Sequence, residues 1–308
     1  MPLNLNRIPD QPFDPLMAKL RRRLFDDQVL SPGVLHSAPF MLVFLGGFFV
    51  PLAIILVYSV MPGHSFSLLQ APTLENYAAI LHGTYYTSLL RSLGLAAVTT
   101  ALLLVVCYPL AFAMVRVFKR FATFVSIMVV LSLFVSENIR LYGWVLSLMK
   151  RGVIMGTLEL LGLPAEGLLY NVPVIIFGMA YVYLPFMLFP LVLGISLVPA
   201  EAREAAFDLG ATRRQIFTLI DLPLSMPGLV TGCMLTFVLS LGAMAEAKIL
   251  GGEQVVTIAD EIQGAFTYGQ NWPMGSALSS VLIGITGLLV FFALRKLDFD
   301  SILRKKTN

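Results

Sequence analysis

The sequence has few of the residues that carry most enzyme chemistry. Only 13% of its 308 residues are charged, and it contains two cysteines and three histidines. Soluble domains average about 25% charged residues. Cys107 and Cys233 both lie in apolar stretches, so they offer neither a disulfide framework nor the spacing of metal ligands. The histidines are scattered along the chain, which disfavours a metal-dependent enzyme within the membrane.

Two motifs are also absent. The N-terminal residues lack the apolar core of a signal peptide. No G-x4-GK[ST] segment occurs, although many ATPases hold phosphate with this loop. We therefore expect no cofactor and no catalytic residue in this chain. If ATP drives the protein, a separate subunit must bind the ATP and its Mg ion.

Apolar residues are abundant. They make up 57% of the chain, and the mean hydropathy is +0.84. A helix of about 20 apolar residues is long enough to cross the hydrocarbon core of a membrane. The pattern therefore predicts an all-α membrane protein with six transmembrane helices. They are expected near residues 38–60, 89–115, 121–148, 171–198, 223–249 and 275–294.

The positive charges predict the orientation. The N-terminal segment, the loop after the second span, the central loop counted from Arg203 and the C-terminal end counted from Arg295 hold 5, 3, 3 and 5 of the 21 Lys and Arg residues. Because cytoplasmic loops are enriched in Lys and Arg, both termini and the central loop should be cytoplasmic. We expect a cytoplasmic N-terminal segment at 1–34, a permease domain at 35–295 and a basic tail at 296–308.

The N-terminal segment has an amphipathic stretch after Asp14-Pro15. Its apolar residues run from Phe13 to Leu24, with Lys19 and Arg21–Arg23 around them. This composition is typical of a helix that lies in the interface of an anionic leaflet. A basic flank that only sets the topology would look the same.

The central loop, Glu204–Gly228, has the pattern of helix, turn and helix. Gly210 can take the left-handed conformation that ends a helix. Thr212 and Gln215 have the spacing of a capping box, which predicts that a second helix begins there. The loop lies between two stretches without any Asp, Glu, Lys or Arg, so it must lie on one side of the membrane.

This loop carries a family resemblance. An EAA-x3-G segment is followed after nine residues by I-x-LP and then by PG. The pattern resembles the cytoplasmic coupling loop, here at 199–223, of permeases in binding-protein-dependent ATP-binding-cassette (ABC) importers. The matching residues are Glu204, Ala205, Ala206, Gly210, Leu222 and Pro223. The alternative is an amphipathic loop that lies on the membrane surface.

The resemblance extends over residues 35–295 and is strongest to polyamine-type permeases. Arg140, Tyr142 and Trp144 match their R-x-Y-x-W segment, and Tyr183–Met187 with Pro190-Leu191 match a YLPFM-x2-PL segment. It implies a type I importer permease fold in a bacterial inner membrane and import of a small cationic or zwitterionic solute. It also implies ATPase subunits, a second permease in a heterodimer and a periplasmic solute-binding protein.

Two alternatives stay open. Relatives of this family import opines, aminophosphonates and similar solutes, so the solute is not determined. A passive channel would belong to another class of protein. It would need neither Glu204 nor Gly210, and it would work without ATP.

The coupling loop allows a sharper prediction. At about 100° per residue, Phe207 points away from the apolar stripe of the first short helix, which consists of Ala202, Ala205, Ala206 and Leu209. We expect Ala205, Ala206 and Leu209 to pack inward on the permease. The residues expected to contact or couple to the ATPase are Glu204, Ala205, Ala206, Phe207, Asp208, Gly210 and Pro223. Alternatively, Phe207 packs on the second short helix near Phe217.

Four ionisable side chains fall inside the expected spans: Glu137, Arg140, Glu246 and Lys248. Such residues are costly in a membrane and usually face a cavity or a partner. Either Glu137 or Glu246 lines the solute path, or Glu137 pairs with Arg140 and Lys248 reaches the outer interface. The aromatic residues near the same level are Tyr142, Trp144, Tyr181 and Tyr183. Their rings could bind an ammonium group or simply form an interfacial belt.

One outer loop has helical spacing at Ile258–Phe266. Asp260 and Glu261 are expected to face water there. The resemblance implies that this surface contacts the solute-binding protein, and a helix that only caps the bundle is the alternative.

Overall fold

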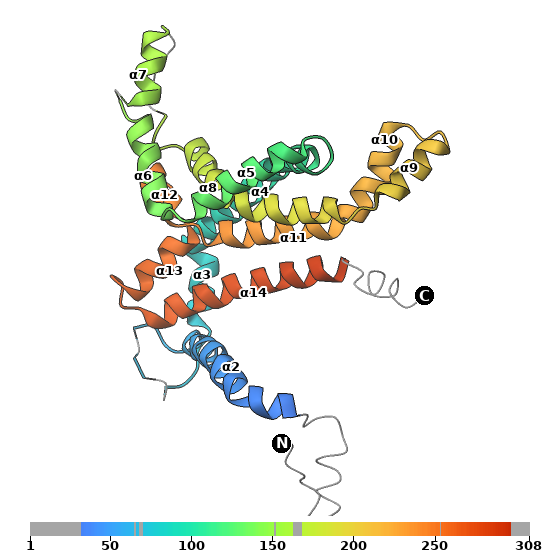
Figure 1. Ribbon diagram of the computed structural model, residues 1–308. Coiled ribbons are helices and arrows are strands. Elements are labelled where there is room, and N and C mark those ends of the chain that lie inside the picture. Colours follow the sequence, from blue (N-terminus) through green and yellow to red (C-terminus); the bar gives the residue numbers. More distant parts are fainter. Residues whose placement is uncertain are drawn as a thin grey trace, which may run out of the picture. The chain divides into compact units, whose positions relative to one another are not determined.

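The computed structural model of the protein describes residues 32–64, 66–67, 70–150, 152–162, 168–252 and 254–296. Within these ranges the regular elements are helices, as Figure 1 shows. The predicted all-α fold is therefore confirmed. The amphipathic stretch expected after Asp14-Pro15 and all but the first residue of the basic tail lie outside the described residues.

The chain divides into two compact units, Met1–Ile55 and Leu56–Asn308. The described part of the first unit belongs to helix α2 (Pro32–Tyr58), which ends in the second unit. This helix contains no charged residue, and its large side chains from Phe40 to Val50 are exposed. An uncharged helix of this length is suited to a membrane span.

The second unit contains four more long apolar helices: α4 (Tyr85–Arg116), α8 (Val172–Ser196), α11 (Leu222–Leu241) and α14 (Trp272–Lys296). With α2 they give five candidate spans among the residues that the structure describes. A sixth span results if a bent pair of helical segments, Arg120–Leu133 and Glu137–Leu160, is counted as one.

Two expected spans differ from the structure. The stretch 121–148 is not one helix, because α5 (Lys119–Leu133) and α6 (Glu137–Leu148) are separated and the bent pair makes an angle of 100°. Ser136 has an extended backbone, so the charged residues Glu137 and Arg140 fall on a new helix. Likewise, α11 ends at Leu241, and α12 (Ala245–Gly251) is a separate short helix.

The core of the second unit lies where α4, α8 and α11 pack together. Gly194 of α8 and Gly228 of α11 meet at the crossing of their helices, where a Cβ on Gly228 would lie 2.6 Å from the Gly194 Cα and would also collide with the Pro190 carbonyl. Small residues let helix backbones approach this closely in membranes.

We predict that Gly228→Ala destabilises the protein. The added methyl meets backbone atoms that cannot move aside, and overpacking of this kind typically costs about 1–3 kcal/mol. The apparent melting temperature in detergent should fall. Gly284→Ala in α14 is the matched control, because a Cβ there meets no atom within 4 Å. Equal melting temperatures for the two variants would contradict the predicted close crossing.

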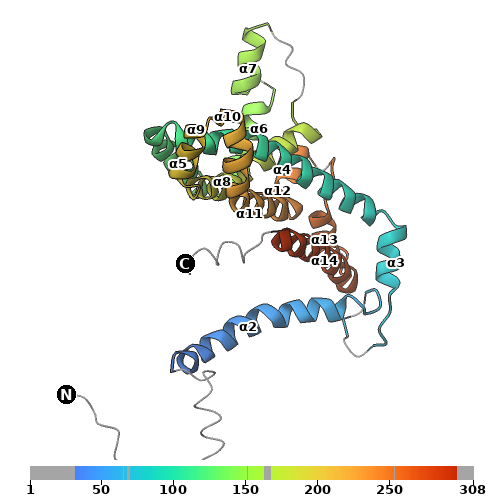
Figure 2. The same ribbon diagram turned by 90° about the vertical axis from the view of Figure 1, so that its right-hand side faces the viewer.

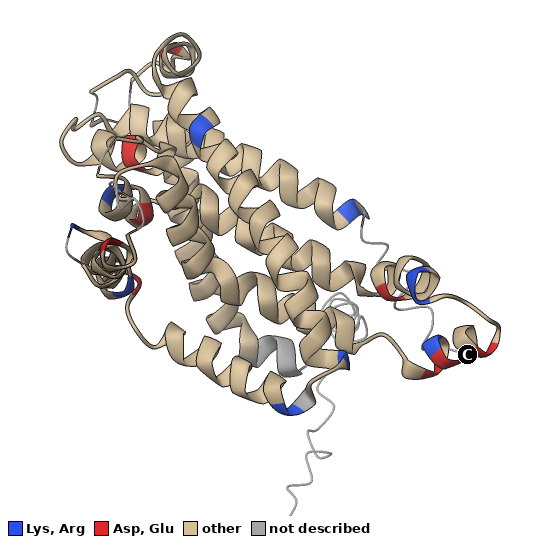
Figure 3. Cartoon of the chain, turned by 90° about the horizontal axis from the view of Figure 1, so that it is seen from above, with Lys and Arg blue, Asp and Glu red and all other residues tan. Residues whose placement is uncertain are grey.

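The second unit has two distinct ends. The short helices α9 (Ala200–Asp208) and α10 (Arg213–Ile216) lie at one end of α8 and α11 (Figure 1). Helices α6, α12 and α13 (Ile258–Phe266) lie at the other. Helix α3 (Glu75–His82) contacts α4 and α14 (Figure 2). Charged residues lie mainly towards the ends of the long helices, as Figure 3 shows.

Candidate functional site

The central loop has the predicted local structure. Helix α9 ends before Gly210, which has a φ of +82°, a conformation that glycine adopts without strain. The Thr212 side chain accepts from the Gln215 backbone N–H, and the Gln215 side chain accepts from the Thr212 N–H, which makes a capping box at the start of α10. The predicted helix, turn and helix are confirmed.

The predicted packing of α9 is wrong in part. None of its residues is buried, Ala205 is exposed, and Leu209 beyond its end is 89% exposed. Leu209 follows the last helical turn and so leaves the apolar stripe. Phe207 is 47% exposed, and the ring contacts of Phe217 are with Tyr108 and Phe112 of α4. The loop therefore presents apolar side chains that this chain leaves uncovered.

The loop is attached to the spans by side chains that the sequence did not suggest. The Arg203 Nε lies 3.2 Å from the Asp221 Oδ1, and the Arg203 guanidinium lies over the Phe112 ring. Arg116 at the end of α4 donates to the carbonyls of Ile195 and Val198 at the end of α8. Because these groups meet, the loop after the second span and the central loop lie on the same side.

The opposite end holds a cluster of charged and aromatic side chains. Glu246 of α12 is fully buried, and the Tyr183 side chain of α8 lies within reach of a hydrogen bond to its carboxylate. Tyr183, Glu137 and Arg140 are close enough to interact with it electrostatically. The break at Gly242 separates α12 from α11, and α12 packs against α6 and α8. The cluster carries two acids and one base, so it favours a cation.

Aromatic rings continue this cluster. The Arg140 guanidinium lies 5.6 Å from the centre of the Tyr181 ring. The Trp144 ring packs edge-on against Tyr181 and against Phe177, with centroids 5.6 and 4.6 Å apart. Phe177 was not expected, because a lone Phe in an apolar span has no distinguishing signal.

Six of the seven residues expected along the path therefore gather in one place. Tyr142 does not join them, because it is 58% exposed and lies two residues from both Arg140 and Trp144 on the helix. The expected pair of Glu137 with Arg140 does not form an ion pair in the part of the chain that the structure describes.

Lys248 and Asp260 also differ from expectation. Asp260 does not simply face water, because its Oδ1 lies 3.4 Å from the Lys248 Nζ, which also donates to the Gln263 Oε1 at 2.6 Å. Glu261 accepts from the Ser88 hydroxyl at 3.0 Å. Helix α13 itself is confirmed over Ile258–Phe266, where a capping box at Thr257 starts it.

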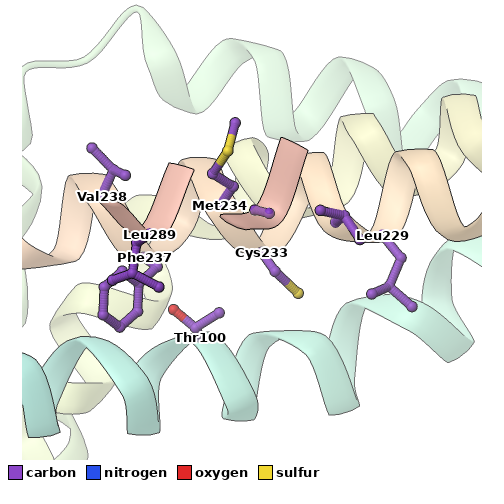
Figure 4. Close-up of a pocket in the computed structure, with 9 residues that line it drawn as sticks. Thr100, Leu229, Cys233, Met234, Phe237, Val238 and Leu289 are labelled. Atoms are coloured by element: carbon purple, nitrogen blue, oxygen red, sulfur yellow. The ribbon is translucent and has the colours of Figure 1, made fainter. Parts of the chain in front are cut away.

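A cavity of about 260 Å³, shown in Figure 4, is lined by none of the residues of the charged cluster. It lies between α4, α11 and α14, and its walls are apolar apart from Thr100 and Cys233. Such walls do not suit a cationic solute, so we assign no solute to it. Among the described residues, no three His, Cys, Asp or Glu side chains are placed to hold a metal ion.

Residues 37–297 match the family described as binding-protein-dependent transport system inner membrane component. The spermidine/putrescine transport system permease protein PotB of Haemophilus influenzae is 33% identical over 239 residues, which cover 77% of this chain and 82% of that protein. PotB of Escherichia coli is 30% identical over 239 residues, with 77% and 86% covered.

Two solved structures have the same fold. A chain of a bacterial ABC transporter involved in alginate import has a TM-score of 0.63 and 18% identity, with 96% of this chain and 100% of that chain covered. A chain of the alginate ABC transporter in complex with an alginate-bound periplasmic protein has a TM-score of 0.66 and 20% identity, with 89% and 96% covered. The type I ABC importer permease fold is thereby confirmed. The chain belongs to the family of inner membrane components of binding-protein-dependent transport systems.

Proposed function

We propose that this chain is a permease subunit that moves a polyamine or a similar small cation into the cytoplasm. The observation that carries the solute class is Glu246, a fully buried acid that forms no ion pair with another described residue. A buried charge is costly unless a counter-charge offsets it. A passing ammonium group would supply that counter-charge. The PotB relatives, named for spermidine and putrescine transport, support the same class.

In this proposal the cluster receives one ammonium end of the solute. Glu246 and Glu137 attract the charge, while Arg140 limits the net negative charge to that of one acid. Tyr181, Tyr183 and Trp144 offer ring faces, to which a cation is attracted by about 0.5–2 kcal/mol. Because Glu246 is fully buried, the helices around it must move before a solute can reach it.

In this proposal, different partner proteins bind at the two ends of the second unit. ATPase subunits, which would hold the ATP and Mg ion, dock on the exposed surface of α9. A second permease completes a heterodimer around the path, and a periplasmic solute-binding protein docks near α13. Both termini and the α9–α10 loop are cytoplasmic, in keeping with their Lys and Arg residues. ATP binding draws the two coupling loops together and opens the path outward.

Uptake into proteoliposomes tests this proposal. The complex is purified through a tag on this chain and supplied with its binding protein, internal ATP and labelled spermidine or putrescine. Saturable uptake that needs both ATP and binding protein is expected. Uptake of an aminophosphonate or an opine in place of both polyamines would favour the alternative solutes. Solute flux without ATP would favour a passive channel and contradict the proposal.

A further inference from the structure

The coupling loop is joined to the spans through one ion pair. The Arg203 Nε of α9 lies 3.2 Å from the Asp221 Oδ1, at the start of α11. Asp221 is only 2% exposed, whereas Arg203 is half-buried. Separating the two side chains would leave the Asp221 charge buried without this partner, so Asp221 favours the position in which Arg203 contacts it.

Arg203 also joins the loop to α4. Its guanidinium carbon lies 5.7 Å from the centre of the Phe112 ring, a geometry that suits cation–π attraction. Phe112 packs edge-on against Phe217, and Tyr108 packs against the same ring at 5.8 Å. A single side chain of α9 therefore contacts both α4 and the segment that leads into α11.

The end of α8 also contacts this group of side chains at the coupling loop. The Arg116 Nη2 donates to the Ile195 carbonyl at 3.1 Å and to the Val198 carbonyl at 2.9 Å. The last carbonyls of a helix lack partners within it, so these bonds satisfy the end of α8. Arg116 also interacts electrostatically with Arg203 and Asp221. The ends of α4, α8 and α11 thus meet around the charged side chains of Arg116, Arg203 and Asp221.

The loop reaches α11 through a π-helical turn, η2 (Phe217–Asp221). Such turns are rare and occur frequently at functional sites. The first and last residues of this turn make the contacts described above. Phe217 packs against Tyr108, and Asp221 pairs with Arg203. The turn therefore changes the helix register at the point where the loop is held.

We infer that Arg203 is a positioning residue that makes α9 rigid with α4 and α11, so that a push on the loop moves the spans. No residue of α9 is buried, and in the described part of the chain Arg203 is the α9 side chain with an ion pair or ring contact to another element. Without it, α9 could swing on the turn at Gly210 while the spans stay still. The inference rests on the proposed function, in which an ATPase pushes on this loop.

The test uses the full complex with Arg203→Met. ATPase subunits should still co-purify and hydrolyse ATP at the parental rate, while solute uptake per ATP falls about tenfold, within the range usual for coupling between sites. Backbone amides of α9 should exchange hydrogen faster. Arg203→Lys keeps the charge beside Asp221 and should recover part of the ratio. Arg213→Met removes an exposed charge from the same loop and should keep the parental ratio.

A second variant separates a loss of coupling from a failure to fold. In Arg203→Met combined with Asp221→Asn, no buried carboxylate is stranded, so the protein should fold while uptake per ATP stays low. A parental ratio in this double variant, or unchanged amide exchange in α9, would overturn the inference. Loss of ATPase binding would also overturn it, because Arg203 would then be a docking contact. If the parent chain itself recruits no ATPase, the proposed function fails first.

Discussion

Replacing Glu246 with Gln should lower polyamine uptake by the reconstituted complex about 30-fold or more. The change removes one negative charge from a buried site and keeps the size of the side chain. Losing one partner of a buried charge pair costs about 2–5 kcal/mol, and each ~1.4 kcal/mol is a factor of ten. The loss should appear as an increase in the polyamine concentration that gives half-maximal uptake. ATPase assembly should be unchanged, because α12 and α9 lie at opposite ends.

Substitutions of two other acids serve as comparisons for Glu246→Gln. Glu137→Gln should cause a smaller loss, because Glu137 is only half-buried in the same cluster. Glu159→Gln removes an exposed charge on α7 (Val153–Leu160) and should leave uptake at the parental level. If Glu246→Gln transported polyamines with parental rate and affinity, Glu246 would not be on the path and the cluster would be a structural feature.

Replacing Phe207 with Ala should strongly reduce the amount of ATPase that co-purifies with this chain. The Phe207 ring is 47% exposed on a helix that buries none of its residues, so a partner is needed to cover it. Aromatic anchors at the centre of an interface commonly contribute about 2 kcal/mol or more, which is about 30-fold in affinity. Coupled uptake should fall with the ATPase, while the melting temperature of the isolated chain stays unchanged.

An exposed aromatic residue at the other end supplies the control. Tyr268 follows α13 and is almost fully exposed, so Tyr268→Ala removes a comparable ring far from α9. It should leave the amount of bound ATPase unchanged. Normal ATPase assembly in Phe207→Ala would show that α9 does not dock through this ring. The Gly210 turn would keep its role in that case.

Local structure in the coupling loop could be predicted because local interactions determine it. Gly210 takes the left-handed conformation, and Thr212 and Gln215 make the capping box that their spacing indicates. The burial of Leu209 could not be predicted in the same way. Whether an apolar stripe is covered depends on what packs against it, and this chain supplies nothing for Leu209.

The acidic cluster could be predicted in part. The cost of ionisable groups in a membrane singled out Glu137, Arg140 and Glu246, and the structure brings them together. The contacts between these side chains of different helices could not be predicted from spacing along one helix. The reason is that two breaks in the helices, at Ser136 and at Gly242, change the directions of α6 and α12. Glu137 and Arg140 stay three residues apart on α6, but the Arg140 guanidinium lies over the Tyr181 ring of α8, so the expected ion pair is not formed.

The ion pair of Arg203 with Asp221 was missed for a similar reason. The two residues are separated by a turn, a capped helix and a π-helical segment, and no periodicity links them. One signal could have found it. Asp221 is an acid directly before an uncharged span, and such a residue needs a partner once it is buried.

ATP hydrolysis by the complex tests the central claim most directly. The complex is isolated through a tag on this chain, and its hydrolysis is measured with the binding protein empty or loaded with spermidine or putrescine. We predict that ATPase subunits co-purify and that the loaded binding protein raises hydrolysis above the level with the empty one. A chain that recruits no ATPase, and that carries solute across vesicles without ATP, would contradict the account.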